Sequence, residues 1–305
     1  MPVDINAADF VDGFDIKRGT VGVVGHGYVG QAVAAFFDRA CKVVVHDKAK
    51  PELMTLVDVV TQSEVIFVCV PTPMRADGQC HTGIVESVIE DVKKTAGDIG
   101  RPLNSFVLVI KSTVRPGFTE EMQGTHLNMR ILFSPEFLTE KSSVKDFQNT
   151  NRVILGGDED DARVVFKYFE GVIPERVADD QTVLLQCEPT VAEMAKLFTN
   201  GMLMTKVLFS NEMYLMAEKL GINYDEVRFL ACLDPRIGES HTRVPGHDGH
   251  LGAGGSCFPK DINNLRFTAS ELGLPEKMFT AVIERNEEIR PEKDWEELKG
   301  RAVVE

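Results

Sequence analysis

The chain has 305 residues, of which 43% are hydrophobic and 26% are charged, and its formal net charge at pH 7 is −14. This length is sufficient for two hydrophobic cores and is long for one ordinary domain, so we expect two domains. The excess of acidic residues argues against a nucleic acid or an anionic membrane as partner, although a locally basic pocket could still bind an anionic small molecule.

No apolar run approaches the roughly eighteen residues that a membrane-spanning helix requires. The N-terminal sequence MPVDINAADFVDGF is acidic and lacks the basic and apolar regions of a signal peptide. The six cysteines are scattered and include no CxxC pair, which is typical of thiols in a reducing compartment. We therefore expect a soluble, cytoplasmic protein without disulfides.

The first part of the chain alternates short apolar runs with segments of helical composition. Apolar runs typical of strands cover residues 20–25, 42–46, 65–70, 106–110, 129–133 and 152–155. Helical segments are expected at residues 28–39, 82–96 and 160–169. Strands as apolar as these are buried on both faces, as in a parallel sheet covered by helices on both sides. The pattern predicts an α/β fold of Rossmann type with a doubly wound parallel sheet.

The sequence GHGYVG, with Gly25, Gly27 and Gly30, lies where the first strand passes into the first helix. In a dinucleotide-binding turn the first glycine permits the bend, the second lets the backbone approach the pyrophosphate, and the third lets the helix pack on the strand. Asp47 ends the second strand, where an acid would bind the ribose 2′-hydroxyl and repel a 2′-phosphate. The pattern favours NAD over NADP, although Lys48 tempers the preference. The alternative is a glycine turn that binds no ligand.

Polar segments follow two later strands, KSTVRPG at residues 111–117 and SPEFLTE at residues 134–140. Both lie at the carboxyl ends of strands, where doubly wound sheets bind their ligands. Thr113 could hold a water or a substrate hydroxyl, and Glu136 and Glu140 are candidates for proton transfer or substrate positioning. Each of these residues could equally be a turn or capping residue.

From residue 189 to residue 220 the chain has apolar residues at three- and four-residue spacing, no proline after Pro189, and a C-terminal glycine signal at Gly221. This pattern predicts one long helix. Its apolar residues occupy more than a single stripe, so the helix should be buried on several sides, and the core of a homodimer is the simplest explanation. A coil-rich stretch from 234 to 256 follows, and then helical segments to residue 290.

Lys196 and Asn200 stand four residues apart on this helix, and therefore on one face. A lysine on so apolar a helix is costly unless it is paired or has a function. A cation near a developing alkoxide stabilises the negative charge, which would be such a function. The alternative is that the side chain of Lys196 extends to solvent.

Cys257 lies in the glycine-dense sequence GAGGSCFPKD, followed by Lys260 and Asp261. A cysteine attacks as its thiolate, which needs partial exposure and nearby positive charge. If a helix starts at about Pro259, Cys257 lies just before its N-terminus, where the partial positive charge favours a thiolate. The alternative is a turn that contains a buried structural cysteine.

The coil contains three histidines and an aspartate in HTRVPGHDGH, residues 241–250. All these side chains come from one coil without the paired spacings of a zinc site, so we expect no metal. Solvated histidines, or contacts to a sugar or phosphate, fit the sequence better. Arg236 and Arg243 in the same coil are natural phosphate ligands.

Six motifs taken in order resemble the UDP-glucose/GDP-mannose dehydrogenase family over about residues 19–290. They are GHGYVG, VPTP (70–73), STV (112–114), SPEFLTE, the AEMAKLFTN helix and GAGGSCFPKD. The resemblance implies an N-terminal extension (1–18), an NAD-binding Rossmann domain (19–185) and a helical central and dimerisation domain (186–305). It also implies an NAD-dependent four-electron oxidation of a nucleotide sugar, with UDP-glucose and its conversion to UDP-glucuronate as the best expectation.

The resemblance carries roles for single residues. Cys257 matches the nucleophile that forms a thiohemiacetal and then a thioester, and Lys196 and Asn200 match the pair around the reacting oxygen. Asp261 matches a carboxylate that organises water and proton transfer. Thr113 and Glu140 match residues tied to thioester hydrolysis. Further expected cofactor contacts are Tyr28, Val29, Pro71, Thr72, Ser112 and Thr113, and expected substrate contacts are Glu136, Phe137, Leu138, Arg243, Gly254 and Lys260.

In the family a second Rossmann-like domain binds the nucleotide end of the substrate, and this chain reaches Glu305 where that domain would begin. The identity of the nucleotide sugar and the way its nucleotide end is bound are therefore left open. Two other functions also fit the residues. One is a two-electron β-hydroxyacid dehydrogenase, which shares a Rossmann domain followed by a helix with Lys and Asn but has no need of Cys257. The other is a non-catalytic NAD-binding partner that requires a separate nucleotide-binding domain.

Overall fold

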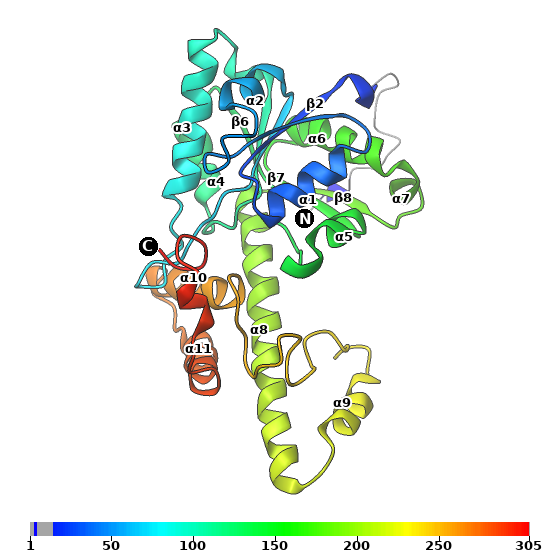
Figure 1. Cartoon of the computed structure of the whole chain (residues 1–305), viewed down its shortest axis with the longest axis vertical. Coiled ribbons are helices and arrows are strands. Elements are labelled where there is room, and N and C mark those ends of the chain that lie inside the picture. The colour runs from blue at the N-terminus through cyan, green and yellow to red at the C-terminus, as the bar shows by residue number, and fades with distance from the viewer. Residues whose placement is uncertain (1–2, 5–14, 305) are drawn as a thin grey trace. The chain divides into compact units, whose positions relative to one another are not determined.

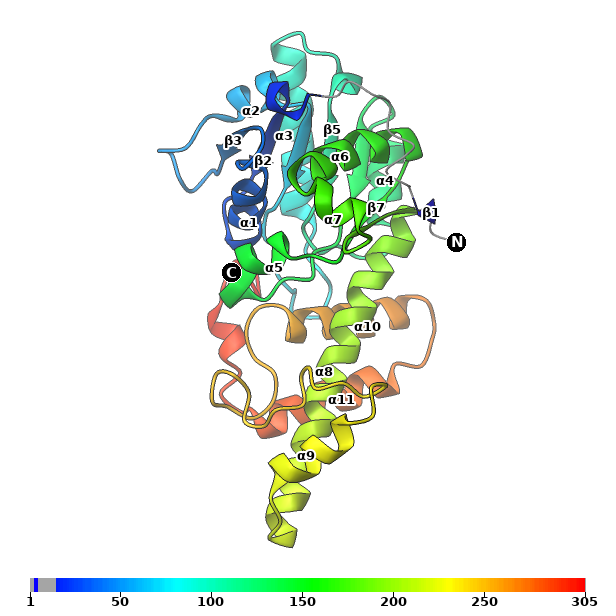
Figure 2. The same ribbon diagram turned by 90° about the vertical axis from the view of Figure 1, so that its right-hand side faces the viewer.

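The computed structural model describes residues 3–4 and 15–304 and divides them into two compact units (Figures 1 and 2). Unit 1 comprises residues 1–72 and 82–196, and unit 2 comprises residues 73–81 and 197–305. Most of the expected N-terminal extension, residues 1–18, lies outside the described residues. Each unit is built around its own hydrophobic core.

Unit 1 contains one sheet, whose strands follow the spatial order β1-β8-β7-β6-β5-β4-β2-β3. The strands are β1 (Val3–Asp4), β2 (Thr20–Val24), β3 (Lys42–His46), β4 (Val65–Val68), β5 (Val107–Ile110), β6 (Arg130–Phe133), β7 (Arg152–Gly156) and β8 (Val183–Cys187). All six predicted strands are confirmed, and the central strands β4 and β5 are buried on both faces. The chain order reverses between β2 and β4, and doubly wound folds bind their ligands at such a point.

The sheet is parallel from β3 to β6, but β7 runs antiparallel to β6. β8 pairs in parallel with β7, and β1 pairs in antiparallel fashion with β8 at the edge. The predicted doubly wound parallel sheet is therefore mostly parallel, with two antiparallel pairings among the described strands. A parallel return needs a full crossover helix, whereas α5 (Ser143–Gln148), between β6 and β7, has only six residues.

Helices cover both faces of the sheet (Figure 1). One face packs against α1 (Tyr28–Phe37), α5, α6 (Glu159–Val172) and α7 (Pro174–Ala178). The other packs against α2 (Leu56–Gln62), α3 (Gly83–Asp98) and α4 (Phe118–Thr125). This three-layer arrangement confirms the Rossmann-type fold class.

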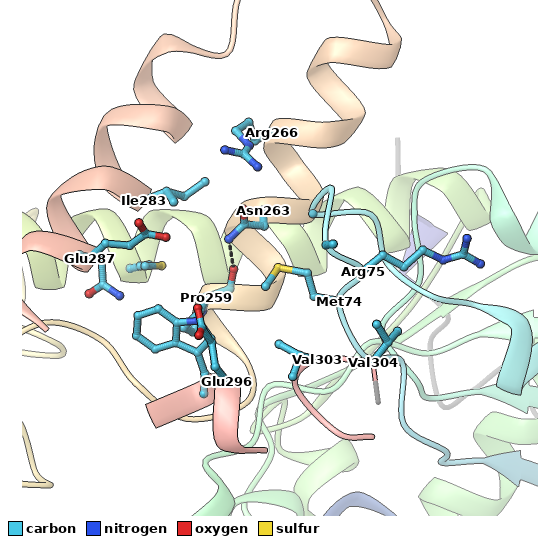
Figure 3. A pocket seen from close by; sticks show the side chains of 15 residues that line it. Met74, Arg75, Pro259, Asn263, Arg266, Ile283, Glu287, Glu296, Val303 and Val304 are labelled. Atoms are coloured by element: carbon cyan, nitrogen blue, oxygen red, sulfur yellow. Dashed lines mark hydrogen bonds between the residues drawn. The ribbon is translucent and has the colours of Figure 1, made fainter. Parts of the chain in front are cut away.

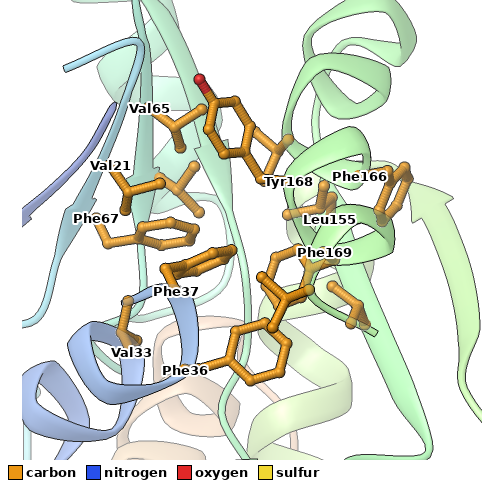
Figure 4. Close-up of a cluster of buried hydrophobic side chains, with 14 of the residues drawn as sticks. Val21, Val33, Phe36, Phe37, Val65, Phe67, Leu155, Phe166, Tyr168 and Phe169 are labelled. Carbon is orange, nitrogen blue, oxygen red and sulfur yellow. The ribbon is translucent and has the colours of Figure 1, made fainter. Parts of the chain in front are cut away.

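A group of aromatic side chains fixes α1 and α6 against the sheet (Figure 4). The rings of Phe36 and Phe37 meet edge to face at 5.0 Å, and Phe37 also packs on Phe169 of α6 at 5.0 Å and on Phe67 of β4 at 5.3 Å. All four rings are fully or almost fully buried. Aromatic pairs of this geometry add about 0.5–1.5 kcal/mol beyond their buried area. The packing therefore fixes the C-terminal end of α1 against β4 and α6.

The helix α8 (Pro189–Leu220) begins in unit 1 and continues in unit 2, and both of its ends confirm the prediction. At its C-terminus Gly221 adopts φ +68°, and the N–H of Ile222 donates to the carbonyl of Ala217 at 3.1 Å. This geometry terminates many helices and favours glycine. Unit 2 further contains α9 (Tyr224–Cys232), α10 (Phe258–Glu271), α11 (Lys277–Ile289) and the 3₁₀ turn η5 (Asp294–Glu297).

Within unit 2, α8 buries one side and exposes another. Leu197, Met204 and Leu208 pack with residues of α10 and α11 in the core of unit 2. Large apolar side chains on a different face are mainly exposed: Phe198, Met202, Phe209, Met216 and Leu220. Their separations of four or seven residues place them on one face of the helix. None of the helices in the described part of the chain is both long and apolar enough to cross a membrane.

Candidate active site

The three glycines of the β2–α1 turn have different surroundings. A Cβ on Gly25, whose φ is +94°, would lie 2.5 Å from the carbonyl oxygen of Cys69, and a Cβ on Gly30 would collide with the carbonyl oxygen of Gly25. These two positions therefore need glycine for the chain to pack. A Cβ on Gly27 would meet nothing within 4 Å. Gly27 thus leaves open space at the N-terminus of α1, which fits the approach of a pyrophosphate.

Asp47 lies beside this turn at the end of β3. Its Oδ2 accepts a hydrogen bond from the backbone N–H of His26 at 2.6 Å, and its Oδ1 accepts one from Ala49 at 2.8 Å. Partial burial acts to raise the pKa of Asp47, but the two backbone donors and Lys50 outweigh it and lower the pKa overall. The carboxylate is therefore charged and keeps lone pairs for ribose hydroxyls, so the residues present fit a dinucleotide without a 2′-phosphate.

The segment that follows β4 is held by Ser112, which follows the neighbouring strand β5. The hydroxyl of Ser112 donates to the carbonyl oxygen of Val70 at 2.7 Å and accepts from the N–H of Val70 at 3.0 Å. Ser112 thus shapes the backbone around Pro71 and Thr72, which were predicted to contact the cofactor. The other predicted cofactor contacts, Tyr28, Val29 and Thr113, are half-buried.

Glu136 and Lys196 form a buried pair in unit 1, with side chains that are 5% and 3% exposed. The Nζ of Lys196 donates to the backbone carbonyl of Glu136 at 2.6 Å and to its Oε1 at 3.0 Å. The Oε2 of Glu136 accepts from the N–H of Leu138 at 2.7 Å. The ring of Phe137 lies 5.6 Å from the Lys196 ammonium and 4.1 Å from the guanidinium of Arg152. Lys196 therefore does not extend to solvent and instead holds the predicted substrate segment.

Lys111 is a second buried lysine, for which no role was predicted. Its Nζ donates to the Ser134 hydroxyl and to the carbonyl of Pro135, both at 3.2 Å, and lies over the ring of Phe147. Burial lowers the pKa of Lys111 to about 8. It lines a pocket of about 330 Å³ together with Glu136. The sequence feature that could have revealed Lys111 is its position directly after the apolar run FVLVI, at the carboxyl end of a predicted strand.

The lowered pKa of Lys111 predicts a pH-dependent stability. The unfolded chain holds this proton up to about pH 10.4 and the folded chain only up to about pH 8, so the unfolded state binds more protons in between. The free energy of unfolding should therefore rise by up to about 3 kcal/mol from pH 8 to pH 10.4, relative to Lys111→Met. Urea denaturation of both proteins across this range checks it. If the difference in free energy of unfolding between the unmodified protein and Lys111→Met did not change with pH, the prediction would be contradicted.

Cys257 is the N-terminal capping residue of α10, one position before Phe258, and is half-exposed. This confirms that the cysteine lies just before a helix, which begins one residue earlier than expected. The backbone carbonyl of Cys257 accepts from the N–H of Asp261 at 2.9 Å, so the first turn is closed directly behind it. None of the six cysteines, all in the described part of the chain, forms a disulfide.

Lys260, Asp261 and Asn200 form a buried group in unit 2. The Lys260 Nζ lies 2.5 Å from Asp261 Oδ1, and the Asn200 amide donates to Asp261 Oδ2 at 2.6 Å. Burial acts to lower the pKa of Lys260, but the adjacent carboxylate of Asp261 outweighs it and raises the pKa. The ammonium is therefore charged, with both oxygens of Asp261 engaged.

The structure brings the predicted site residues together in two groups. Unit 1 joins Glu136, Phe137, Leu138 and Lys196, and unit 2 joins Asn200, Lys260 and Asp261 next to Cys257. Glu140, in the 3₁₀ turn η4 (Glu140–Ser142), and Arg243 are exposed.

A pocket of about 400 Å³ lies on a different face of α10 (Figure 3). Pro259, Asn263 and Arg266 form its wall on this helix, at positions that share one helical face. Met74 and Trp295 also line it. No predicted catalytic residue lines this pocket, so it is not the predicted site.

The histidine-rich coil is held by contacts to other side chains. The ring of His241 lies 5.5 Å from that of Phe258, Asp248 pairs with Arg290 at 2.8 Å, and His250 lies 3.2 Å from Glu292. Among the described residues, no group of three His, Cys, Asp or Glu side chains is arranged to hold a metal ion.

Comparison with known families matches both units. Residues 42–170 match the NAD binding domain of the UDP-glucose/GDP-mannose dehydrogenase family, and residues 190–288 match its central domain. The chain belongs to this family. Unit 1 is therefore NAD-binding, in agreement with the glycine turn and Asp47, and the family expected from the six motifs is confirmed.

A UDP-glucose 6-dehydrogenase of Streptococcus pneumoniae is 33% identical over 228 residues, which cover 73% of this chain and 54% of that protein. The chain spans about half the length of other curated relatives as well. A solved UDP-glucose dehydrogenase from Pyrobaculum islandicum superposes with a TM-score of 0.77 at 27% identity, covering 92% of this chain and 70% of that chain.

A solved 3-hydroxyisobutyrate dehydrogenase from Mycobacterium tuberculosis superposes with a TM-score of 0.71 at 17% identity. The match covers 90% of this chain and 95% of that chain. At this identity the likeness shows the fold alone. The β-hydroxyacid alternative thus shares the architecture, and the distinction between the two activities depends on the site residues.

Proposed function

We propose that the chain carries the NAD-binding and central units of a nucleotide-sugar 6-dehydrogenase that oxidises UDP-glucose to UDP-glucuronate. The observation that supports this most strongly is the half-exposed Cys257 at the start of α10, beside the buried group of Lys260, Asp261 and Asn200. A two-electron dehydrogenase has no use for such a thiol. We also propose the domain limits 1–18, 19–185 and 186–305, with the third domain dimerising.

In the proposed reaction the β2–α1 turn and Asp47 would hold NAD, which would supply the hydride acceptor for each of the two oxidations, so that two NAD are consumed per sugar. Cys257 Sγ bonds to the aldehyde carbon while its proton passes to the aldehyde oxygen, which gives a thiohemiacetal. Loss of the hydride from that carbon to the second NAD and of the hydroxyl proton leaves a thioester. Water then attacks the carbon, the C–S bond breaks, and the carboxylate and the thiol are released. We assign proton transfer to Asp261 and stabilisation of the oxyanions to Lys196 and Asn200.

The remaining predicted residues receive proposed roles of positioning. Thr113 and Glu140 act on the hydrolytic water, and Glu136 with Phe137 and Leu138 forms a substrate wall supported by Lys196. Lys260 and Arg243 bind the anionic substrate. A cation near a diphosphate is favourable, and guanidinium is well suited to it.

The number of NADH molecules formed per sugar tests the proposal. The purified chain is incubated with limiting UDP-glucose, GDP-mannose or a UDP-N-acetylhexosamine and excess NAD, and NADH is read by absorbance. Two NADH per UDP-glucose are expected. One NADH would favour the two-electron alternative. No NADH with any sugar would favour the NAD-binding partner that needs a separate domain.

Replacing Asp47 with alanine should weaken NAD binding by about tenfold, because about one charge-assisted hydrogen bond to the ribose is lost. The variant should also discriminate less against NADP, since the carboxylate no longer repels a 2′-phosphate. Calorimetric titration with both cofactors measures this, and Lys48→Ala serves as a control at the adjacent position. Tighter binding of NADP than NAD by the unmodified protein would contradict the assignment.

We propose that the exposed apolar face of α8 in unit 2 forms a homodimer by packing against the same face of a second copy. Burying one such side chain contributes about 1.5–3 kcal/mol. Phe209→Asp should therefore give a monomer by light scattering, because each interface would bury two unpaired carboxylates. Phe229→Asp, at an exposed site on α9, is the matched control. An unmodified protein that is monomeric and active at assay concentration would refute the dimer.

A further inference from the structure

The loop that leads into Cys257, residues 252–257, is fastened through its backbone by side chains from outside it. Asn286 of α11, which is 1% exposed, pairs with both polar groups of Ala253. Its Oδ1 accepts from the Ala253 N–H at 2.7 Å, and its Nδ2 donates to the Ala253 carbonyl at 2.9 Å. One side-chain amide thus takes the place of a neighbouring strand.

Two more backbone N–H groups of the loop have side-chain acceptors. Gly252 donates to Asn211 Oδ1 of α8 at 3.1 Å, and Gly255 donates to Asp294 Oδ2 of η5 at 3.2 Å. The loop is therefore held from three separate elements of unit 2. Two of these elements, α8 and α11, contribute residues to the core of unit 2, and η5 follows α11 in the chain.

Arg290 holds these anchors in turn, and its side chain is 4% exposed. Its Nε donates to Asp294 Oδ1 at 2.6 Å, and a terminal nitrogen lies 2.8 Å from Asp248 and 3.4 Å from the carbonyl of Leu251. A planar guanidinium can bind two carboxylates at fixed angles, which an ammonium cannot do. Asn286 lies in the last turn of α11, and Arg290 is the capping residue that follows the helix, with its N–H donating to the carbonyl of Asn286 at 2.9 Å.

Arg290 also explains why residue 254 is a glycine. A Cβ at this position would collide with the Arg290 guanidinium. Gly252 and Gly255 both adopt φ +71°, a region that L side chains rarely enter. A segment this rich in glycine loses much conformational freedom when it is ordered, so it needs specific bonds to adopt a single conformation.

We infer that Asn286 and Arg290 are positioning residues for the Cys257 thiol, acting through the backbone of residues 252–255. The inference rests on the proposed function in so far as Cys257 is the nucleophile. Neither residue touches the thiol. Their effect is to place the sulfur where it can reach the aldehyde carbon, and a displacement of about 1 Å can lower a rate by about a hundredfold.

The first readout needs no nucleotide sugar. The full chain and its variants Asn286→Ala, Arg290→Met and Arg290→Lys are treated with iodoacetamide, and alkylation of each cysteine is followed by mass spectrometry. Cys232, the other half-exposed cysteine, is the internal reference, and the buried cysteines report general loosening. Arg285→Met is the matched control, because Arg285 lies on α11 and its described ion pairs are with Glu288 and Glu212.

We expect Cys257 to be alkylated at least about threefold faster in Asn286→Ala and Arg290→Met, because the released loop exposes the sulfur, with Cys232 unchanged. In the same variants kcat should fall about a hundredfold with KM nearly constant. Arg290→Lys should recover part of both effects, and Arg285→Met should show neither.

The inference would be overturned by an unchanged ratio of Cys257 to Cys232 alkylation in both variants, or by a rise shared by all six cysteines. Faster turnover or a pure KM effect would do the same. If no nucleotide sugar is oxidised by any form of the chain while Cys257 alone gains reactivity, the proposed function fails and the positioning of the thiol stands.

Discussion

Replacing Cys257 with serine is expected to abolish formation of the uronic acid while NAD binding stays unchanged. A hydroxyl is far less nucleophilic than a thiolate at neutral pH, so the covalent intermediate cannot form. Slow formation of one NADH from the first oxidation should survive, because that step does not need the thioester. The measurement is product analysis by chromatography, together with calorimetric titration of NAD.

Cys232→Ser is the control, since Cys232 is also half-exposed but belongs to α9. This variant should convert UDP-glucose at the normal rate. Steady-state production of UDP-glucuronate by Cys257→Ser at the unmodified rate would remove the thioester from the mechanism. The remaining explanation would then be direct oxidation of a hydrated aldehyde.

Asp261→Ala should reduce the free energy of unfolding by about 3–5 kcal/mol, which is the cost of removing one partner from a buried ion pair. The change leaves the ammonium of Lys260 and the amide of Asn200 buried without the carboxylate that both contact. Urea denaturation measures the loss independently of any activity. The substitution Asp261→Ala should also abolish turnover if Asp261 has the proposed role in proton transfer.

Two comparisons separate the burial of charge from the loss of packing. In the double variant Lys260→Met with Asp261→Leu, most of the stability should return, because no unpaired charge is left. Asp225→Ala breaks an exposed pair with Arg228 and should cost less than about 1 kcal/mol. If Asp261→Ala also lowered the free energy of unfolding by less than about 1 kcal/mol, another group would have to compensate the charge of the buried Lys260 ammonium.

The parts of the fold that follow from local pattern are confirmed. The spacing of apolar residues predicts α8 with both of its ends, and the six apolar runs predict six strands of the sheet. The glycine spacing predicts the β2–α1 turn, because the packing of Gly25 and Gly30 is a local requirement. These features depend on residues close together in the sequence, which is why the sequence alone reveals them.

Other features depend on distant partners. The reversed direction of β7 is set by the path of the chain between Phe133 and Arg152, and an apolar run has the same pattern in either direction. The strand β8 and the short helices α2 and α9 carry too few periodic residues to stand out.

The supporting residues of the site were missed for a related reason. Lys111, Asn286 and Arg290 become informative only when Ser134, Ala253 and Asp294 are known to lie beside them. A lone lysine or asparagine at the end of a strand or helix has many common explanations. The predicted roles of the site residues themselves remain proposals.

The antiparallel pair of β6 and β7 also divides the hydrogen-bonded backbone of the unit 1 sheet into two parts. Among the described residues, β6 and β7 share one paired position, Phe133 with Gly156, whereas the parallel strands share continuous ladders. The backbone therefore forms a seam there, and cohesion across it depends on side chains such as Phe36, Phe147 and Phe169. We expect the two sides of the seam to open as separate cooperative blocks, which native-state hydrogen exchange would detect. Sequence change in this family should accordingly be tolerated less at these three aromatic positions than along the ladders themselves.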